Sequence, residues 1–169
     1  MRYTNGKGVV AMNSRLRVYI ETTIFNWCFE VGREYSIESK RLFEKIAAGE
    51  VTAFTSTAAM KELKQAPEPK WSQMLKLITT HNIKVWEMEQ EAEALADLYI
   101  AAGIIPARFW LDGVHIAMAA TNDADCIISL NFKLPAEIAP FASHTLFGAW
   151  HVIQSSCDHT NRRFYSWED

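Results

Sequence analysis

Short apolar runs alternate with amphipathic stretches along most of the chain, and this alternation constrains the fold more than any other feature. Runs rich in β-branched and aromatic residues predict strands over 17–20, 51–56, 83–86 and 125–130. Helical spacing of apolar residues predicts helices over 36–50, 56–66, 68–82, 89–103 and 107–122. Strands that are separated by helices pair in parallel and are covered on both faces. The chain is therefore expected to form an α/β fold on a central parallel sheet.

Two of the predicted helices carry specific side-chain expectations. Ser36 is the expected N-cap of the helix over 36–50, and Gly49 is its stop signal. The inward residues of this helix are expected to be Leu42, Phe43 and Ile46. The apolar face of the helix over 68–82 is expected to consist of Trp71, Met74, Leu75 and Ile78.

The composition fits one globular domain without a membrane span. The chain has 169 residues, of which 49% are hydrophobic, and this is ample for one core. No apolar run reaches the roughly 18 residues that a membrane span needs. The formal net charge of −3 argues against a surface coated with basic residues, although it leaves local basic patches open. The three cysteines are widely spaced and form no CxxC pattern, which favours a reducing, cytoplasmic location.

The two ends of the chain differ in pattern from its middle. The first fifteen residues form a polar stretch without the long apolar segment of a secretory signal. From residue 143 onward the sequence is rich in Trp, His and Phe and is weakly patterned. The sequence is therefore expected to divide into a polar leader over 1–15, one domain over 16–150 and a divergent tail over 151–169.

Four oxygen-bearing side chains fall where they could meet at one edge of the predicted sheet. Glu21 directly follows the first strand, and Asn131 directly follows the last strand. Glu62 lies six residues past the second strand, and Asp112 lies early in the helix before the last strand. Ligands of parallel α/β sheets bind beyond the carboxyl ends of the strands. Oxygen ligands gathered at such an edge suit Mg²⁺ or Mn²⁺.

Each acid also has an ordinary structural interpretation. Glu21 could be a solvated loop residue or the N-cap of a following helix. Glu62 is flanked by Lys61 and Lys64 and could lie on a solvated helix face. Asp112 stands out because it lies within an apolar segment, where a buried carboxylate is costly unless it is paired or bound to a metal.

Four segments of the chain resemble motifs of the PIN-domain family, and they occur in that family's order. They cover roughly residues 16 to 134 and read VYIETTIFN, TSTAAMKELKQAP, LDGVHIAMAA and DADCIISLNFK. The first resembles the family's first strand, an apolar run followed by Asp-Thr-Ser or Asp-Thr-Thr. The third resembles the motif of its fourth helix, in which Asp, a small residue and an apolar residue precede His-Ile-Ala. The resemblance implies a three-layer α/β/α sandwich on a central parallel sheet.

The resemblance also assigns candidate site residues one by one. It implies that four positions are both catalytic residues and ligands of Mg²⁺ or Mn²⁺. In chain order these would be Glu21, Glu62, Asp112 and Asn131. The family has either Asp or Asn at the fourth of these positions. Thr22 and Ser129 match hydroxyl positions that support the metal ligands.

Two features of the sequence depart from the family pattern. Glu21 stands where Asp is commoner, and its side chain is longer by one methylene. Because Mg²⁺ requires near-octahedral ligands at about 2.0–2.1 Å, the backbone or the metal would have to adjust. The second departure is that no His follows the Asn-Phe-Lys segment at residues 131–133.

The activity that the resemblance implies is that of a Mg²⁺- or Mn²⁺-dependent endoribonuclease, which hydrolyses RNA phosphodiester bonds. Many bacterial members of the family are toxins of toxin–antitoxin pairs. The expected partners are an RNA substrate and, as further candidates, an antitoxin protein and a second copy of the chain, with no membrane. The alternative function is a catalytically impaired PIN fold that binds RNA or a protein, which the two departures would explain.

Two further features have two interpretations each. His115 could face the site, but packing in the core with one satisfied nitrogen is the favoured interpretation. A basic helix face is usually solvated, although near an acidic metal site it could hold phosphates. The residues of one such face are Lys61, Lys64 and Lys70.

Overall fold

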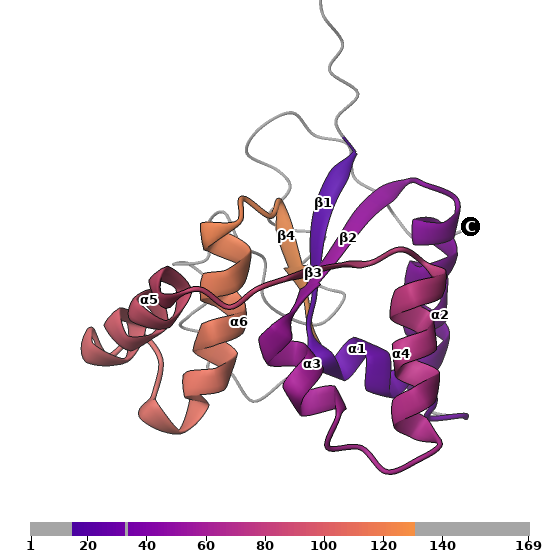
Figure 1. The fold of residues 1–169 in the computed structure, drawn as a ribbon, viewed down its shortest axis with the longest axis horizontal. Coiled ribbons are helices and arrows are strands. Elements are labelled where there is room, and N and C mark those ends of the chain that lie inside the picture. Colours follow the sequence, from indigo (N-terminus) through magenta and orange to yellow (C-terminus); the bar gives the residue numbers. More distant parts are fainter. Residues whose placement is uncertain (1–14, 33, 131–169) are drawn as a thin grey trace, which may run out of the picture.

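A computed structural model describes residues 15–32 and 34–130 of the chain (Figure 1). The strands are β1 Leu16–Ile20, β2 Val51–Ser56, β3 Lys84–Trp86 and β4 Cys126–Ile128. The helices are α1 Thr22–Trp27, α2 Glu34–Ala47, α3 Thr57–Leu63, α4 Lys70–Thr80, α5 Gln90–Ala101 and α6 Trp110–Thr121, and the 3₁₀ turn η1 Ala107–Phe109 directly precedes α6. The expected tail, Asn131 and nearly all of the expected leader lie outside the described residues, so the division into domains remains a prediction.

The four strands form one parallel sheet in the order β3-β2-β1-β4. In the register of the sheet, Val18 of β1 lies opposite Ala53 of β2 on one side and opposite Cys126 of β4 on the other. Each strand therefore returns to the same end of the sheet through a helical connection, as expected for strands that alternate with helices. The predicted central parallel sheet is confirmed.

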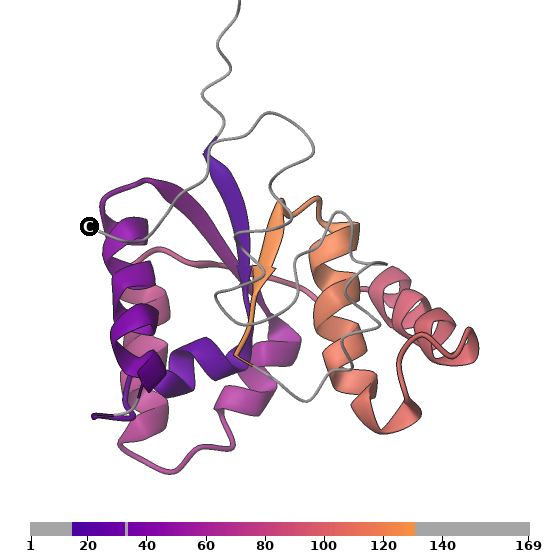
Figure 2. The ribbon, with the colours of Figure 1, turned by 180° about the vertical axis from the view of Figure 1, so that it is seen from behind.

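Alternate residues of β1 point into two separate cores, one on each face of the sheet. Val18 and Ile20 belong to a core that they share with buried side chains of α1, α2 and α4. Tyr19 belongs to the other core, which is built with α5 and α6. This is the two-residue periodicity of a strand that is buried on both faces. Figures 1 and 2 show the result, with α2 and α4 on one side of the sheet and α5 and α6 on the other. The predicted three-layer α/β/α sandwich is confirmed.

Three helical segments begin or end at the carboxyl edge of this sheet. α1 follows β1 after Glu21 alone, and α3 follows β2 without any intervening residue. α6 leads into β4, which is parallel to β1, so α6 runs in the opposite direction to the strands and its first turn lies toward the same edge (Figure 1). Segments that are far apart in the sequence therefore converge there.

Helix α2 bears out most of its predicted pattern but not its predicted start. Leu42, Phe43 and Ile46 are buried, and Gly49 has a φ of 73° just after the helix ends. Ser36 does not cap the helix. It lies inside α2, which begins at Glu34, and its side chain is buried.

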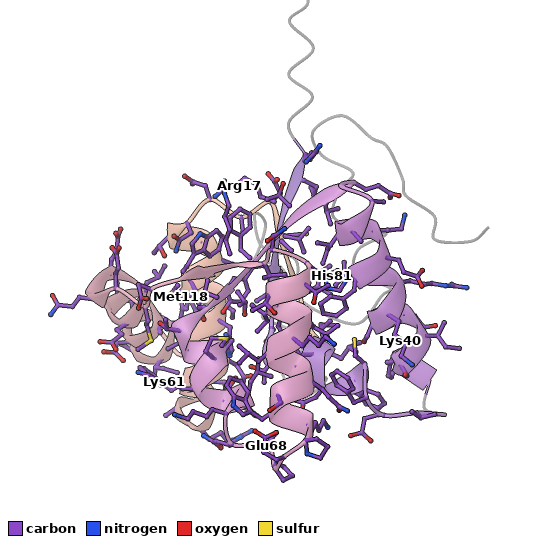
Figure 3. The ribbon with its side chains drawn as sticks, turned by 45° about the vertical axis from the view of Figure 1, so that its right-hand side comes forward. Arg17, Lys40, Lys61, Glu68, His81 and Met118 are labelled. Atoms are coloured by element: carbon purple, nitrogen blue, oxygen red, sulfur yellow. The ribbon has the colours of Figure 1, made fainter. Side chains whose placement is uncertain are left out.

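Helix α4 packs on the same face of the sheet as α2. Met74 and Ile78 are buried as predicted, whereas Leu75 is 36% exposed and is not part of the buried face. At the end of α4, the imidazole ring of His81 packs edge-on against the ring of Phe43, with the ring centroids 5.2 Å apart. Figure 3 shows His81 on the side of α4 that faces α2. Within residues 15–32 and 34–130, none of the helices is both long enough and apolar enough to cross a lipid bilayer.

Candidate metal centre

Glu21 lies between β1 and α1 and is almost fully buried, with 6% of its surface exposed. It is the N-cap of α1, because its side chain accepts a hydrogen bond from the backbone N–H of Thr23 at 3.1 Å. Its own backbone N–H donates to the carbonyl of Ile128 in β4 at 3.0 Å. The position of Glu21 is therefore fixed by the sheet on one side and by the helix on the other.

One oxygen of Glu21 accepts all of its side-chain hydrogen bonds within the described part of the chain. The donors to Oε2 are the Thr23 N–H, the Thr23 hydroxyl and the Ser129 hydroxyl, the last at 2.9 Å. Thr23 Oγ1 also accepts from the Leu130 N–H at 2.8 Å, which joins α1 to the end of β4. Oε1 is left for another partner.

Glu62 in α3 is oriented in the same manner by two donors to its Oε2. One is the Thr22 hydroxyl, and the other is Nε2 of His115 at 3.0 Å. Burial would raise the pKa of Glu62. The hydrogen bond with His115, the charge that His115 carries when protonated, and the Thr22 hydroxyl outweigh it, so the pKa of Glu62 lies below its usual value. Glu62 is therefore held as a carboxylate.

His115 connects Glu62 to the core on the α5–α6 face of the sheet. Its ring is 2% exposed, and its Nδ1 lies 2.8 Å from the hydroxyl of Tyr19. The same Tyr19 hydroxyl lies 2.7 Å from Oγ of Ser56, the N-cap of α3. Both imidazole nitrogens therefore have hydrogen-bonding partners, one in the core and one in the site.

Glu21, Glu62 and His115 form the one group of potential metal ligands found among residues 15–32 and 34–130. One ligand atom from each lies within 4.8 Å of the others. In this part of the chain no Lys or Arg forms an ion pair with either carboxylate. Two carboxylates in a mostly buried site without a neighbouring cation repel one another, and a bound cation would relieve this. Their hard oxygen atoms fit Mg²⁺ or Mn²⁺.

Comparison with solved structures finds the same architecture in VapC20 of Mycobacterium tuberculosis, which is described as a toxin that cleaves the sarcin–ricin loop. The TM-score is 0.53 and the identity is 11%, and the match covers 69% of this chain and 91% of VapC20. This chain has a PIN-like fold. No protein-family model matches the chain, and no curated protein matches it either.

Two of the four acid and amide positions carried over from the PIN family come together in this PIN-like fold. Glu21 and Glu62 belong to the group described above. Asp112 lies in the first turn of α6, half-buried and three residues before His115, but it is not a member of that group. Residues three apart share a helix face, so Asp112 lies one turn from the site. Asn131 lies outside the described residues.

The two predicted supporting hydroxyls lie against the two acids. Thr22 donates to Glu62, and Ser129 donates to Glu21. Sequence reasoning did not identify Thr23, although a threonine two residues after an acidic N-cap is well placed for such a contact. It favoured a core role for His115 with one satisfied nitrogen. The ring is buried as expected, but its second nitrogen also has a partner, Glu62 of the site.

Proposed function

We propose that this protein is a metal-dependent ribonuclease in which Glu21 and Glu62 hold Mg²⁺ or Mn²⁺. The observation that supports the proposal best is the pair of carboxylates at the carboxyl edge of a PIN-like fold, each fixed by its Oε2. In both residues Oε1 accepts no hydrogen bond from the described part of the chain, and it is the oxygen left for a cation.

The protein's own residues would act by orientation and by charge. A metal held there would activate water and stabilise negative charge on the phosphodiester oxygens. Thr23 and Ser129 hold Glu21, while Thr22 and His115 hold Glu62, so neither carboxylate has to reorganise when it binds a cation. Such preorganisation is the main contribution a protein scaffold makes to this class of chemistry.

RNA is proposed as the substrate because the chain resembles the PIN-domain family in its motifs and resembles VapC20, described as a toxin that cleaves the sarcin–ricin loop, in its fold. Lys61 is exposed and directly precedes Glu62 on α3, and Figure 3 shows it on the surface of that helix. Lys64 is exposed as well, whereas Lys70 forms an ion pair with Glu30 at 2.9 Å. We assign Lys61 and Lys64 to phosphate contacts that position the RNA. A toxin role in the cytoplasm and a partner antitoxin belong to the same proposal.

The proposal is tested with the full chain, single-stranded RNA and Mn²⁺. The wild-type protein should cleave the RNA, and EDTA should abolish the cleavage. Glu62→Gln keeps the size of the side chain and removes its charge, so cleavage should fall by about a hundredfold or more. Glu44→Gln is the matched control, since it makes the same change on the exposed surface of α2 and should retain the wild-type rate.

Two other results would contradict the proposal. Equal cleavage by Glu62→Gln and the wild-type protein would exclude the metal centre described above. Metal-loaded wild-type protein that binds RNA without cutting it would instead favour the alternative function, a PIN-like binding module.

Asp112 is proposed as a further acid of the site, acting from the first turn of α6. Asp112→Asn retains the shape of the side chain and should lower Mn²⁺-dependent cleavage by about a hundredfold. The thermal midpoint of the apo protein should change little. If Asp112→Asn cleaved RNA at the wild-type rate, Asp112 would not be a functional acid of the site. Glu21 and Glu62 would then be the functional acids among residues 15–32 and 34–130.

A further inference from the structure

A continuous chain of hydrogen bonds, buried except for its part-buried last bond, starts at the N-cap of α3 and ends at Glu62 of the same helix. It begins where the Ala59 N–H donates to Oγ of Ser56 at 3.2 Å. It continues through the hydroxyl of Tyr19 on β1 to Nδ1 of His115 on α6, over distances of 2.7 and 2.8 Å. It ends where Nε2 of His115 meets Oε2 of Glu62 at 3.0 Å. Three elements that meet at the carboxyl edge of the sheet are joined by it.

The direction of this chain is set at the helix end. Ser56 is fully buried, and Oγ has two partners among the described residues, the Ala59 N–H and the Tyr19 hydroxyl. Ala59 N–H can only donate, so the Ser56 hydroxyl has only the Tyr19 oxygen to receive its proton. The Tyr19 hydroxyl must then donate onward, and its acceptor is Nδ1 of His115.

The phenol of Tyr19 is suited to this donor role. A phenol has one proton to donate and an oxygen that can accept, so the Tyr19 hydroxyl can accept from Ser56 and donate to His115. A proton on Nδ1 of His115 as well would leave the buried Tyr19 hydroxyl without an acceptor, which costs free energy.

We propose that His115 is a positioning residue with its proton on Nε2, which fixes Glu62 for the metal and is not itself a metal ligand. The proposal rests on the proposed function of the site. It narrows the group of three potential ligands to two carboxylates, because both nitrogens of His115 are engaged, Nδ1 as an acceptor and Nε2–H as a donor. A histidine that bound the metal through Nε2 would have to release that proton and its contact with Glu62.

The proposal is tested first on the wild-type protein by long-range ¹H–¹⁵N NMR of the labelled imidazole rings, after assignment of the five histidines. His115 should carry its proton on Nε2 in the apo protein and should retain it at saturating Mg²⁺. An Nδ1–H tautomer in the apo protein, or loss of the Nε2 proton when Mg²⁺ binds, would overturn the proposal. The result does not depend on any variant being able to fold.

Tyr19→Phe then tests whether His115 supports metal binding by positioning Glu62. The substitution removes the hydroxyl but keeps the ring, which stacks on Trp86 with centroids 5.9 Å apart. Nδ1 of His115 loses its hydrogen-bond donor, so the ring is held only through its contact with Glu62. The affinity for Mn²⁺ measured by calorimetry should fall by about 10-fold or more, as for other losses of groups that orient metal ligands.

Thr55→Val is the matched control for Tyr19→Phe. It also removes a fully buried hydroxyl, one that donates to the Ile20 carbonyl at 3.0 Å and has no part in the chain. The tautomer and the Mn²⁺ affinity should be those of the wild type. A Tyr19→Phe protein with the wild-type affinity for Mn²⁺ would contradict the proposal. If the wild-type protein bound no Mn²⁺, the proposed function would fail, whereas the wild-type tautomer would still support or overturn the role of His115.

Discussion

In the proposed metal centre, Glu21 would have two roles, one for each oxygen of its carboxylate. Oε2 caps α1 and receives the hydroxyls of Thr23 and Ser129, while Oε1 is left for a cation. The ordinary interpretation of this residue, an N-cap, and the metal-ligand interpretation are therefore compatible.

Shortening Glu21 distinguishes two interpretations of this residue. In one, Glu21 is a metal ligand that works at its present length, and in the other it has drifted from the Asp that is commoner in the PIN family. Glu21→Asp withdraws the carboxylate by one methylene, so it cannot both keep its contacts with Thr23 and Ser129 and reach the same cation. Mn²⁺ affinity measured by calorimetry should fall. Glu21→Gln, which keeps the length and removes the charge, is the companion variant and should also bind Mn²⁺ weakly. Tighter binding or faster cleavage by Glu21→Asp would show that Glu21 is a drifted position.

The lowered pKa of Glu62 predicts how the stability of the apo protein depends on pH. Folding favours the ionised carboxylate, so Glu62 contributes stability at neutral pH, and this contribution is lost as the pH falls from the usual 4.5 through the lowered pKa. Glu62→Gln does not titrate. In EDTA its thermal midpoint should therefore fall less between about pH 5 and pH 3 than that of the wild type.

Glu44→Gln serves as the control for this measurement too, because it changes an exposed glutamate away from the site. Its midpoint should follow the wild-type pH dependence. If the curve for Glu62→Gln also followed the wild type throughout the acid range, the hydrogen bonds from Thr22 and His115 would not be stabilising the ionised form of Glu62.

At the scale of elements, α1 is the helix that sequence reasoning did not find. It spans six residues, Thr22–Trp27, and is rich in β-branched and aromatic side chains that disfavour helix when isolated. Tertiary contacts decide its conformation, since Ile24 and Phe25 are buried in the core and Glu21 caps its start. The longer helices, whose apolar residues recur at regular spacing, were predicted to within a few residues at most of their ends.

Two glycine substitutions in and near helices α5 and α6 should have opposite effects on the free energy of unfolding. In α6, a Cβ added at Gly113 would lie 3.4 Å from Cδ1 of Ile105 and 3.7 Å from Cβ of Ala96, which is ordinary van der Waals contact. Gly113→Ala should therefore raise the free energy of unfolding by about 0.5–1 kcal/mol, through the lower chain entropy of the unfolded state.

Gly103 follows the C-cap of α5 with a φ of 70°, where nothing obstructs a Cβ but the backbone conformation is unfavourable for alanine. Gly103→Ala should lower the free energy of unfolding by about 1 kcal/mol. Urea denaturation with an unchanged slope would measure both variants. A fall in stability for Gly113→Ala would contradict the packing described for α6, and a rise for Gly103→Ala would contradict the backbone conformation described for Gly103.

At the scale of the whole molecule, the alternation of strands and helices was enough to predict the parallel sheet and its covered faces. The same topology predicted that Glu21 and Glu62 would lie at one edge, although they are far apart in the sequence. Burial was harder to predict. The apolar neighbours of Asp112 suggested the most buried acid, yet Asp112 is half-buried and Glu21 is the buried one.

The role of His115 could not be predicted because it depends on three elements at once. Its two partners, Tyr19 on β1 and Glu62 on α3, are 96 and 53 residues away in sequence. Local patterns give the face of a helix on which a residue lies, but not which polar groups other elements bring to that face. Buried hydrogen-bond networks of this kind are set by the assembled fold.

The central claim is that Glu21 and Glu62 jointly hold a divalent cation. Crystals of the wild-type protein soaked in Mn²⁺ and measured for anomalous scattering should show a peak within about 2.2 Å of one carboxylate oxygen of each residue. The peak should be absent from Glu62→Gln crystals soaked in the same way, and present in Glu44→Gln crystals. No peak between Glu21 and Glu62 at saturating Mn²⁺, with the two carboxylates where this structure places them, would contradict the account.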